Sequence, residues 1–219
     1  GVQTCALPIF APVSLMSKRV TVLLAHPAFP ARTLTEYLAH ARANPGRINV
    51  SATGAGSIPH LAAAWLHGIS RTSVTYVQYK GTSPLMVDLV AGRVDVNASP
   101  LVNGLPYLKS GKLKALGILS DERSTLLPGM QTAAEQGAPG YNYASWLGIS
   151  APARTPSAIV GKLSAELGRI ARDPEVANRF APEGNTMVGS SPQVLADLVA
   201  NEIERWQKLV AENNIKLEE

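Results

Sequence analysis

The chain has 219 residues, of which 46% are hydrophobic and 16% are charged, proportions typical of a globular protein and not of a disordered one. Its net charge of +4 comes from Lys and Arg residues scattered along the sequence, so no basic stripe favours nucleic acid as a partner. The single cysteine, Cys5, excludes an intramolecular disulfide and a cysteine-based zinc site, and no pattern of residues indicates a cofactor or a metal.

The first 17 residues match neither a signal peptide nor a folded element. The stretch is mildly apolar, but the positive charges of Lys18 and Arg19 follow it, whereas in a signal peptide they precede the apolar run. We therefore predict that residues 1–17 form an unstructured tail outside the fold.

From residue 20 onward, apolar residues recur with the periods of strands and helices. The continuous apolar run 20–25 predicts a buried strand, and Thr33 is placed to cap a helix that ends at Ala43. The apolar face of that helix consists of Leu34, Tyr37, Leu38 and Ala41. Further strands are predicted at 48–53, 74–79, 94–98, 113–119 and 146–150, and further helices at 57–69, 84–91, 105–109 and 132–136 and after Thr155, Asp173 and Ser191. Strands that alternate with helices at this spacing predict parallel α/β sheets.

A glycine-broken loop joins the predicted strand 48–53 to the predicted helix 57–69. Gly54 and Gly56 allow a sharp turn and a close approach to a ligand, and Ser57 is placed as the N-cap of the helix. The first N–H groups of a helix lack internal partners and carry partial positive charge, so the loop can hold a carboxylate or a phosphate. An ordinary strand-to-helix turn explains the same pattern, and the local sequence leaves both interpretations open.

Two other loops follow the ends of predicted strands. One runs from Tyr79 to Thr82, and the other turns at residues 98–100. In open α/β sheets, ligands bind beyond the carboxyl ends of the strands. We therefore expect these loops and the glycine loop to converge on one pocket.

Six blocks of sequence, in this order, resemble one known family. They are residues 46–61 (GRINVSATGAGSIPHL), 77–81 (VQYKG), 92–95 (GRVD), 105–113 (LPYLKSGKL), 127–137 (LPGMQTAAEQG) and 146–153 (WLGISAPA). Together they resemble the tripartite tricarboxylate transporter substrate-binding proteins, also called Bug-type or TctC-like receptors.

The resemblance implies a two-lobed α/β fold like that of type II periplasmic binding proteins. Such a protein is a monomeric periplasmic receptor without catalytic activity, which captures a small organic carboxylate and delivers it to a membrane permease. By position, residues 31–144 would form the second lobe, and residues 18–30 and 145–219 would belong to the first. The family's opening strand, loop and helix, with a P-G-G-x-x-D ligand loop, has no counterpart here, so we expect an incomplete first lobe and weak binding by the chain as given.

Carried over position by position, the resemblance implies eight ligand-binding residues. They are Thr53, Gly54, Gly56 and Ser57 as donors at the helix start, Tyr79, Gly81 and Thr82 as wall and second-loop donors, and Ser99 across the pocket. Ser99 stands where members that bind amino acids tend to carry an acid. We therefore expect a carboxylate without an amine, unless Asp95 points inward and supplies the missing charge.

Two alternative functions are kept. The effector lobe of a transcription regulator has a similar two-lobed shape, and fold analogy does not separate a sensor from a receptor. A hydrolase built on Ser57 and His60 is a weaker alternative, because a residue three positions along the same helix usually packs against its own turn. The motifs G-x-S-x-G and G-x-x-x-x-G-K-[ST] do not occur in the sequence.

Overall fold

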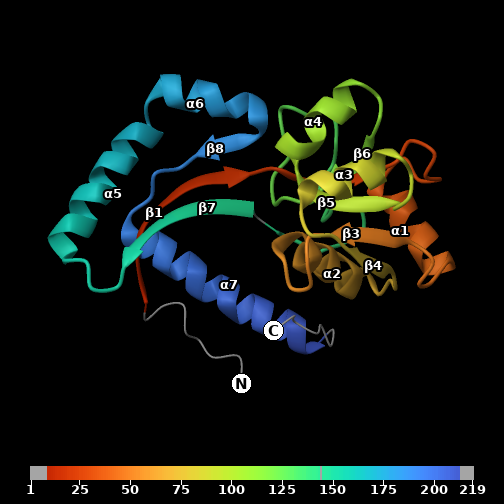
Figure 1. Ribbon diagram of the computed structural model, residues 1–219, viewed down its shortest axis with the longest axis horizontal. Helices are drawn as coiled ribbons and strands as arrows, with labels where there is room; N and C mark the ends of the chain where they lie inside the picture. Colours follow the sequence, from red (N-terminus) through yellow and green to blue (C-terminus); the bar gives the residue numbers. More distant parts are fainter. Residues whose placement is uncertain (1–8, 144, 213–219) are drawn as a thin grey trace. The chain divides into compact units, whose positions relative to one another are not determined.

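The computed structural model describes residues 9–143 and 145–212. These residues form two compact units, one drawn from residues 9–19 and 145–208 and the other from residues 20–143 and 209–212. Figure 1 labels the elements of both units. Among the described residues, no helix has the length and apolar character needed to cross a membrane.

The larger unit is built on a five-stranded sheet. Its strands are β2 (Thr21–Ala25), β3 (Asn49–Ala52), β4 (Thr75–Gln78), β5 (Val96–Pro100) and β6 (Lys114–Ile118), in the order β4-β3-β5-β2-β6. β3 runs parallel to β4 and β5, as predicted. β2, however, is antiparallel to both β5 and β6, so the prediction of a purely parallel sheet is wrong. A strand buried on both faces reads as a continuous apolar run in either direction, which is why the sequence does not reveal its direction.

Four helices accompany this sheet: α1 (Leu34–Ala43), α2 (Ile58–Ser70), α3 (Thr82–Val90) and α4 (Leu101–Lys109). The predicted cap and apolar face of α1 are confirmed, because Thr33 Oγ1 accepts the N–H of Glu36 and all four predicted core residues are buried. Ser57 is the N-cap of α2, as predicted. Good caps and a regular apolar face make a helix recognisable from local sequence alone.

Three helix predictions need correction. α3 begins at Thr82 with Gly81 as its N-cap, so Ser83 lies inside the helix and does not cap it. α4 begins at Leu101, four residues before the predicted start at residue 105, and contains Pro106 in its interior. The predicted helix 132–136 is a series of turns, because Thr132 forms a bridge beside the end of β6 instead of starting a helix.

One apolar layer of the larger unit lies between the sheet and helices α3 and α4. Val22 and Leu24 from β2 pack in a cluster with Leu85 and Leu89 from α3 and with Leu101 from α4. Each such side chain contributes about 1.5–3 kcal/mol when it is fully buried. This layer holds the beginnings of α3 and α4 in fixed positions at the sheet.

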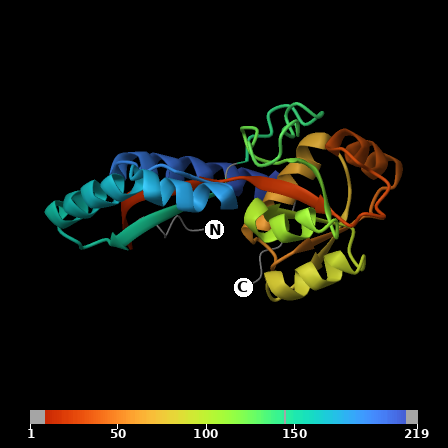
Figure 2. The same cartoon turned by 90° about the horizontal axis from the view of Figure 1, so that it is seen from above.

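The smaller unit contains a three-stranded antiparallel sheet. Its strands are β1 (Phe10–Arg19), β7 (Ser145–Pro152) and β8 (Asn185–Met187), in the order β7-β1-β8. The helices are α5 (Ser157–Ala171), α6 (Pro174–Phe180) and most of α7 (Pro192–Glu212), with a short 3₁₀ turn η1 (Ala181–Glu183) before β8. α5 packs along β1. Figure 2 shows α5 in teal and β1 in red.

The predicted tail is wrong where the structure describes it. Residues 10–17 belong to β1, the central strand of this sheet, while residues 1–8 lie outside the described residues. The strand escaped prediction because its register against β7 shifts between Pro12 and Ser14 and again between Leu15 and Ser17. Such bulges interrupt the alternation by which a strand is recognised.

The predicted lobe boundaries also need correction. We assigned residues 18–30 to the same lobe as residues 145–219, but residues 20–30 belong to the larger unit. The reason is that β2 lies between β5 and β6 inside the five-stranded sheet. The boundary near residue 144 agrees with the division between the two units.

Candidate functional site

The topology brings all eight predicted site residues to one edge of the five-stranded sheet. β3, β4 and β5 are neighbours and run in the same direction, so their carboxyl ends meet at one edge, here called the carboxyl edge. The loop 53–57, here called the anion loop, follows β3, and the segment 79–82 follows β4. Ser99 lies in the last two residues of β5. These segments therefore share one edge of the sheet, as predicted, and the prediction that they line a common pocket stays a prediction.

Three helices begin at the carboxyl edge. α2, α3 and α4 each follow one of these parallel strands after a short connection. The N-cap of α3 is Gly81, which provides no side-chain acceptor, and Thr82 and Ser83 in its first turn are exposed. Because the N-terminus of a helix carries about half a positive charge, three such ends make this edge favourable for an anion.

The anion loop presents free backbone donors. Gly54 has φ +95° and Gly56 has φ +76°, conformations that glycine adopts without strain. No described residue accepts a hydrogen bond from the N–H of Gly54 or of Ala55. Ser57 Oγ accepts the N–H of His60 at 3.4 Å, which leaves the hydroxyl proton of Ser57 available to a ligand.

The N–H of Gly56 is already occupied by the helix that follows. It donates to His60 Nδ1 at 2.9 Å, and the His60 side chain is 6% exposed, with its ring edge-on to Tyr76 at 4.5 Å. Burial lowers the pKa of His60, which favours the neutral ring that can accept this bond. We had predicted Gly56 as a direct donor and His60 as a packed or surface residue. The sequence signal for this hydrogen bond was the spacing of four residues between Gly56 and His60, which is about one turn of a helix.

Tyr79 has both of its donors engaged within the fold. Its N–H donates to Ala52 O at 2.8 Å, and its hydroxyl donates to Asp88 Oδ2 at 2.8 Å. Asp88 in turn pairs with Arg93 at 2.7 Å. Burial, assisted by the hydrogen bond to Asp88, raises the pKa of Tyr79 to about 12. Only the ring of Tyr79 remains to contact a ligand, as part of a wall.

Ser99 has polar neighbours that the sequence did not single out. Ser99 is 3% exposed, and its Oγ accepts from Asn103 Nδ2 at 3.4 Å. On the adjacent strand, Thr21 donates its N–H to Ser120 Oγ at 2.8 Å. The hydroxyl of Thr21 is buried and has no hydrogen-bond partner among the described residues, so a water or a ligand atom would satisfy it. A single Thr in an apolar run gave too little signal for prediction.

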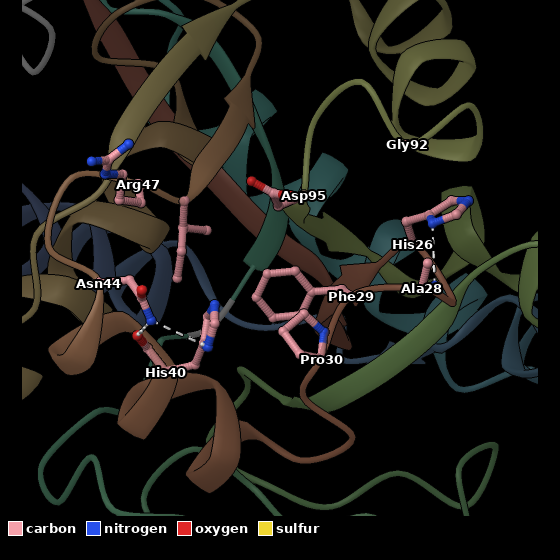
Figure 3. Close-up of a pocket in the computed structure, with 10 residues that line it drawn as sticks. His26, Ala28, Phe29, Pro30, His40, Asn44, Arg47, Gly92 and Asp95 are labelled. Atoms are coloured by element: carbon pink, nitrogen blue, oxygen red, sulfur yellow. Dashed lines mark hydrogen bonds between the residues drawn. The ribbon is translucent and has the colours of Figure 1, made fainter.

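A pocket of about 260 Å³ lies at the opposite edge of the same sheet (Figure 3). It is lined by His26, Ala28, Phe29, Pro30, His40, Asn44, Arg47, Ile48, Gly92 and Asp95, which include none of the predicted site residues. Figure 3 shows the His40 ring beside that of Phe29, with centroids 5.5 Å apart. The lining combines a carboxylate with imidazoles and a guanidinium, so it does not favour an anion as clearly as the carboxyl edge does. No group of His, Cys, Asp and Glu among the described residues fits a metal ion.

The geometry does not support a serine nucleophile. Ser57 Oγ faces the backbone N–H of His60, whereas the His60 ring accepts from Gly56. A nucleophilic serine needs a hydrogen bond from its hydroxyl to the imidazole of its general base. The two residues instead stabilise the start of α2.

The fold is that of an α/β protein whose donor-rich carboxyl edge has the chemistry to hold a small anion. The model of the tripartite tricarboxylate transporter family receptor (TctC) matches residues 7–215, and the chain belongs to this family. The match includes residues 7–17 of the segment that we predicted to be a tail. The family consists of transporter receptors, so the hydrolase alternative is wrong and the prediction that the protein is not an enzyme is confirmed.

Curated relatives agree with this assignment. The chain is 37% identical over 204 residues to the "UPF0065 protein in tcbD-tcbE intergenic region" of Pseudomonas sp. (strain P51), covering 93% of this chain and 61% of that protein. It is 31% identical over 206 residues to protein BugT of Bordetella pertussis, covering 94% of this chain and 63% of BugT. The chain therefore spans somewhat over three fifths of the length of these relatives.

Solved structures confirm the predicted fold class. An R. palustris protein, Rpa4515 with adipate, superposes with a TM-score of 0.88 at 28% identity, covering 97% of this chain and 71% of that one. MatC from Rhodopseudomonas palustris with bound malate gives a TM-score of 0.81 at 35% identity, covering 92% and 69%. The chain thus has the α/β fold of these periplasmic binding proteins over part of their length.

Proposed function

We propose that the whole protein is a periplasmic receptor that captures a small organic carboxylate for a tripartite tricarboxylate-type transporter. In this role it binds the carboxylate as a monomer and delivers it to the membrane permease of the transporter. Membership of the receptor family supports this proposal. So do the dicarboxylates present in the two Rhodopseudomonas structures.

The observation that carries the proposal is the composition of the carboxyl edge. Three helices begin there, and the residues that accompany them provide hydroxyls and backbone N–H groups. None of the eight predicted residues, nor Thr21 or Ser120, is acidic. An ammonium group is costly to bury without a negative partner, so this edge suits a carboxylate that lacks an amine.

Within this proposal, the residues have different roles. Gly54 and Ser57 donate to one carboxylate from the anion loop, together with Thr53. Gly81 and Thr82 do so from the start of α3, and Ser99 lies on the neighbouring strand. Tyr79 forms a wall with its ring, and Gly56 acts through the shape of the loop because its own N–H is engaged.

Calorimetric titration of the 219-residue chain with adipate, malate, succinate and aspartate tests the proposal. We expect at least one of the three dicarboxylates to bind more tightly than aspartate, because aspartate brings an amine that finds no acid at this edge. Tighter binding of aspartate would overturn the proposed ligand class. Binding that is unaffected by the substitution Ser57→Ala described below would place the ligand elsewhere.

A further inference from the structure

We propose that His60 is a positioning residue of the anion loop. Its uncharged side chain holds the loop at the start of α2 by accepting a hydrogen bond, whereas an acidic side chain at this position would repel the ligand. This inference rests on the proposed function, since it concerns the same carboxylate site. It assigns to His60 a role in binding without contact between His60 and the ligand.

The hydrogen bonds around Ser57 form a reciprocal cap. Ser57 is the N-cap, and its Oγ accepts the N–H of His60, the third residue of the helix. The side chain of His60 reaches back and accepts the N–H of Gly56 at 2.9 Å. In the common capping box, a Glu or Gln at the third position accepts the N–H of the N-cap itself. His60 stands at that third position but accepts the N–H of the residue before the N-cap, while the N–H of Ser57 donates to Gly54 O at 3.2 Å.

A charged residue at this position would conflict with an anionic ligand. A capping-box glutamate satisfies a backbone donor equally well, but it places a full negative charge beside the free N–H groups of Gly54 and Ala55. Two like charges a few ångströms apart repel each other strongly where water is partly excluded. A neutral imidazole accepts the same hydrogen bond without this repulsion.

The surroundings of His60 keep its ring neutral and fixed in orientation. The ring is edge-on to Tyr76 of β4, and Tyr76 in turn lies edge-on to His67, farther along α2. Burial raises the pKa of Tyr76 and lowers the pKa of His67, so both are uncharged at neutral pH. Neither of these two groups therefore carries a charge that would favour the protonated form of His60, and burial lowers the pKa of His60.

Three substitutions at residue 60 separate the effect of its hydrogen bond to Gly56 from the effect of its charge. His60→Gln provides a neutral acceptor, His60→Glu provides a charged one of nearly the same size, and His60→Leu provides none. Hydrogen exchange at the Gly56 amide, followed by NMR in the 219-residue chain, reports the hydrogen bond itself. Calorimetric titration with succinate at pH 8, where a glutamate is ionised, reports the effect on binding.

We expect His60→Leu to raise the exchange rate of the Gly56 amide at least tenfold, while Gln and Glu keep it within about threefold of wild type. We also expect His60→Glu to bind succinate at least tenfold more weakly than His60→Gln. His40→Gln, in the pocket at the opposite edge, should change neither quantity and serves as the control.

Two results would overturn the inference. Unchanged exchange at Gly56 in His60→Leu would show that His60 does not hold the loop. Equal succinate affinities of the Gln and Glu variants would show that the charge at this position has no effect on the ligand. Because we expect the chain as given to bind weakly, the titrations extend to high carboxylate concentration. If wild type binds none of the carboxylates even there, the proposed function fails, and the exchange rates still decide whether His60 positions the loop.

Discussion

The backbone N–H of Asn49 donates a hydrogen bond of 2.7 Å to Oδ2 of Asp95. The backbone returns a second bond, from Asp95 N to Asn49 O at 3.0 Å. Both residues lie where β3 and β5 begin, whereas the anion loop lies where β3 ends. The four residues of β3 separate the two edges by about 13 Å. Asp95 therefore does not supply a charge to the carboxyl edge. The sequence had left open that Asp95 points inward and favours a ligand with an amine, and this alternative no longer applies.

This relationship predicts that Asp95 affects stability and not ligand choice. Asp95→Asn keeps an oxygen for the Asn49 N–H, so the affinities for succinate and aspartate should stay within about twofold of wild type. Asp95→Ala leaves that donor without an acceptor and should lower the free energy of unfolding by about 1–3 kcal/mol. Calorimetry and urea denaturation measure the two effects. A selective loss of aspartate binding in Asp95→Asn would contradict the prediction.

Ser57 should contribute to both binding and stability. Ser57→Ala removes the cap of α2 and a hydroxyl donor of the anion loop, and it should weaken succinate binding by about 1–2 kcal/mol. The matched control is Thr33→Ala. It removes the corresponding cap of α1, and Thr33 is not one of the residues of the carboxyl edge. Both variants should lose up to about 1 kcal/mol of stability, but only Ser57→Ala should lose affinity. Equal affinities in the two variants would move the anion site toward Gly81 and Thr82.

Local signals predicted some of the helices and three of their caps. Thr33, Ser57 and Asp173 act as N-caps, and the apolar face of α1 is buried at the predicted positions. Each of these features depends on residues within one or two turns of the chain. The sequence of a short segment therefore contains enough information to specify them.

Features that depend on distant partners were not predictable. The direction of β2 is set by its neighbours β5 and β6, and the central position of β1 depends on β7 and β8, which lie more than 120 residues away. At the candidate site, the sequence predicted that three loops lie at one edge of the sheet, because parallel strands share an edge, and the fold places them there. It did not reveal that Gly56 and Tyr79 have internal partners, since those bonds depend on side-chain orientation.

His67 should make the larger unit sensitive to acid. Its Nε2 lies 3.1 Å from the Tyr37 hydroxyl and its Nδ1 lies 2.7 Å from Thr72 Oγ1. Burial lowers the pKa of His67 to about 4, against 6.5 for a free histidine. Between pH 6.5 and pH 4, His67 therefore binds a proton in the unfolded chain but not in the folded chain. This contribution to stability is complete above pH 6.5 and is lost as the pH falls toward 4, by up to about 3 kcal/mol.

The variant His67→Gln isolates this effect. It should be less stable than wild type at pH 7, because one or both hydrogen bonds are lost, but its stability should fall less steeply between pH 6.5 and pH 4. Urea midpoints measured across this range provide the comparison. Parallel curves for the two proteins would show that His67 does not carry the pH dependence.

The exposed apolar residues of α5 should promote self-association of the chain. Ile159 and Leu163 are 50% and 44% exposed, and they lie one turn apart on the same helix. Exposed apolar patches of this kind favour association and aggregation. Ile159→Gln combined with Leu163→Lys should raise the concentration at which light scattering first detects oligomers, with stability changed by less than about 0.5 kcal/mol. If the double variant associates as readily as wild type, another surface is responsible.

Two glycines that both have open space around them should respond to alanine in opposite ways. Nothing lies within 4 Å of a Cβ added at Gly54 or at Gly161, but Gly54 has φ +95° whereas Gly161 lies inside α5. Gly54→Ala should therefore cost about 1–2 kcal/mol of stability through backbone strain. It should also weaken succinate binding, because the anion loop must shift to relieve that strain. Gly161→Ala should add up to about 1 kcal/mol, since alanine favours the helix, without any change in affinity. Thermal unfolding and calorimetry of the two variants check this, and a tolerated alanine at residue 54 would show that the conformation of the loop is not required for binding.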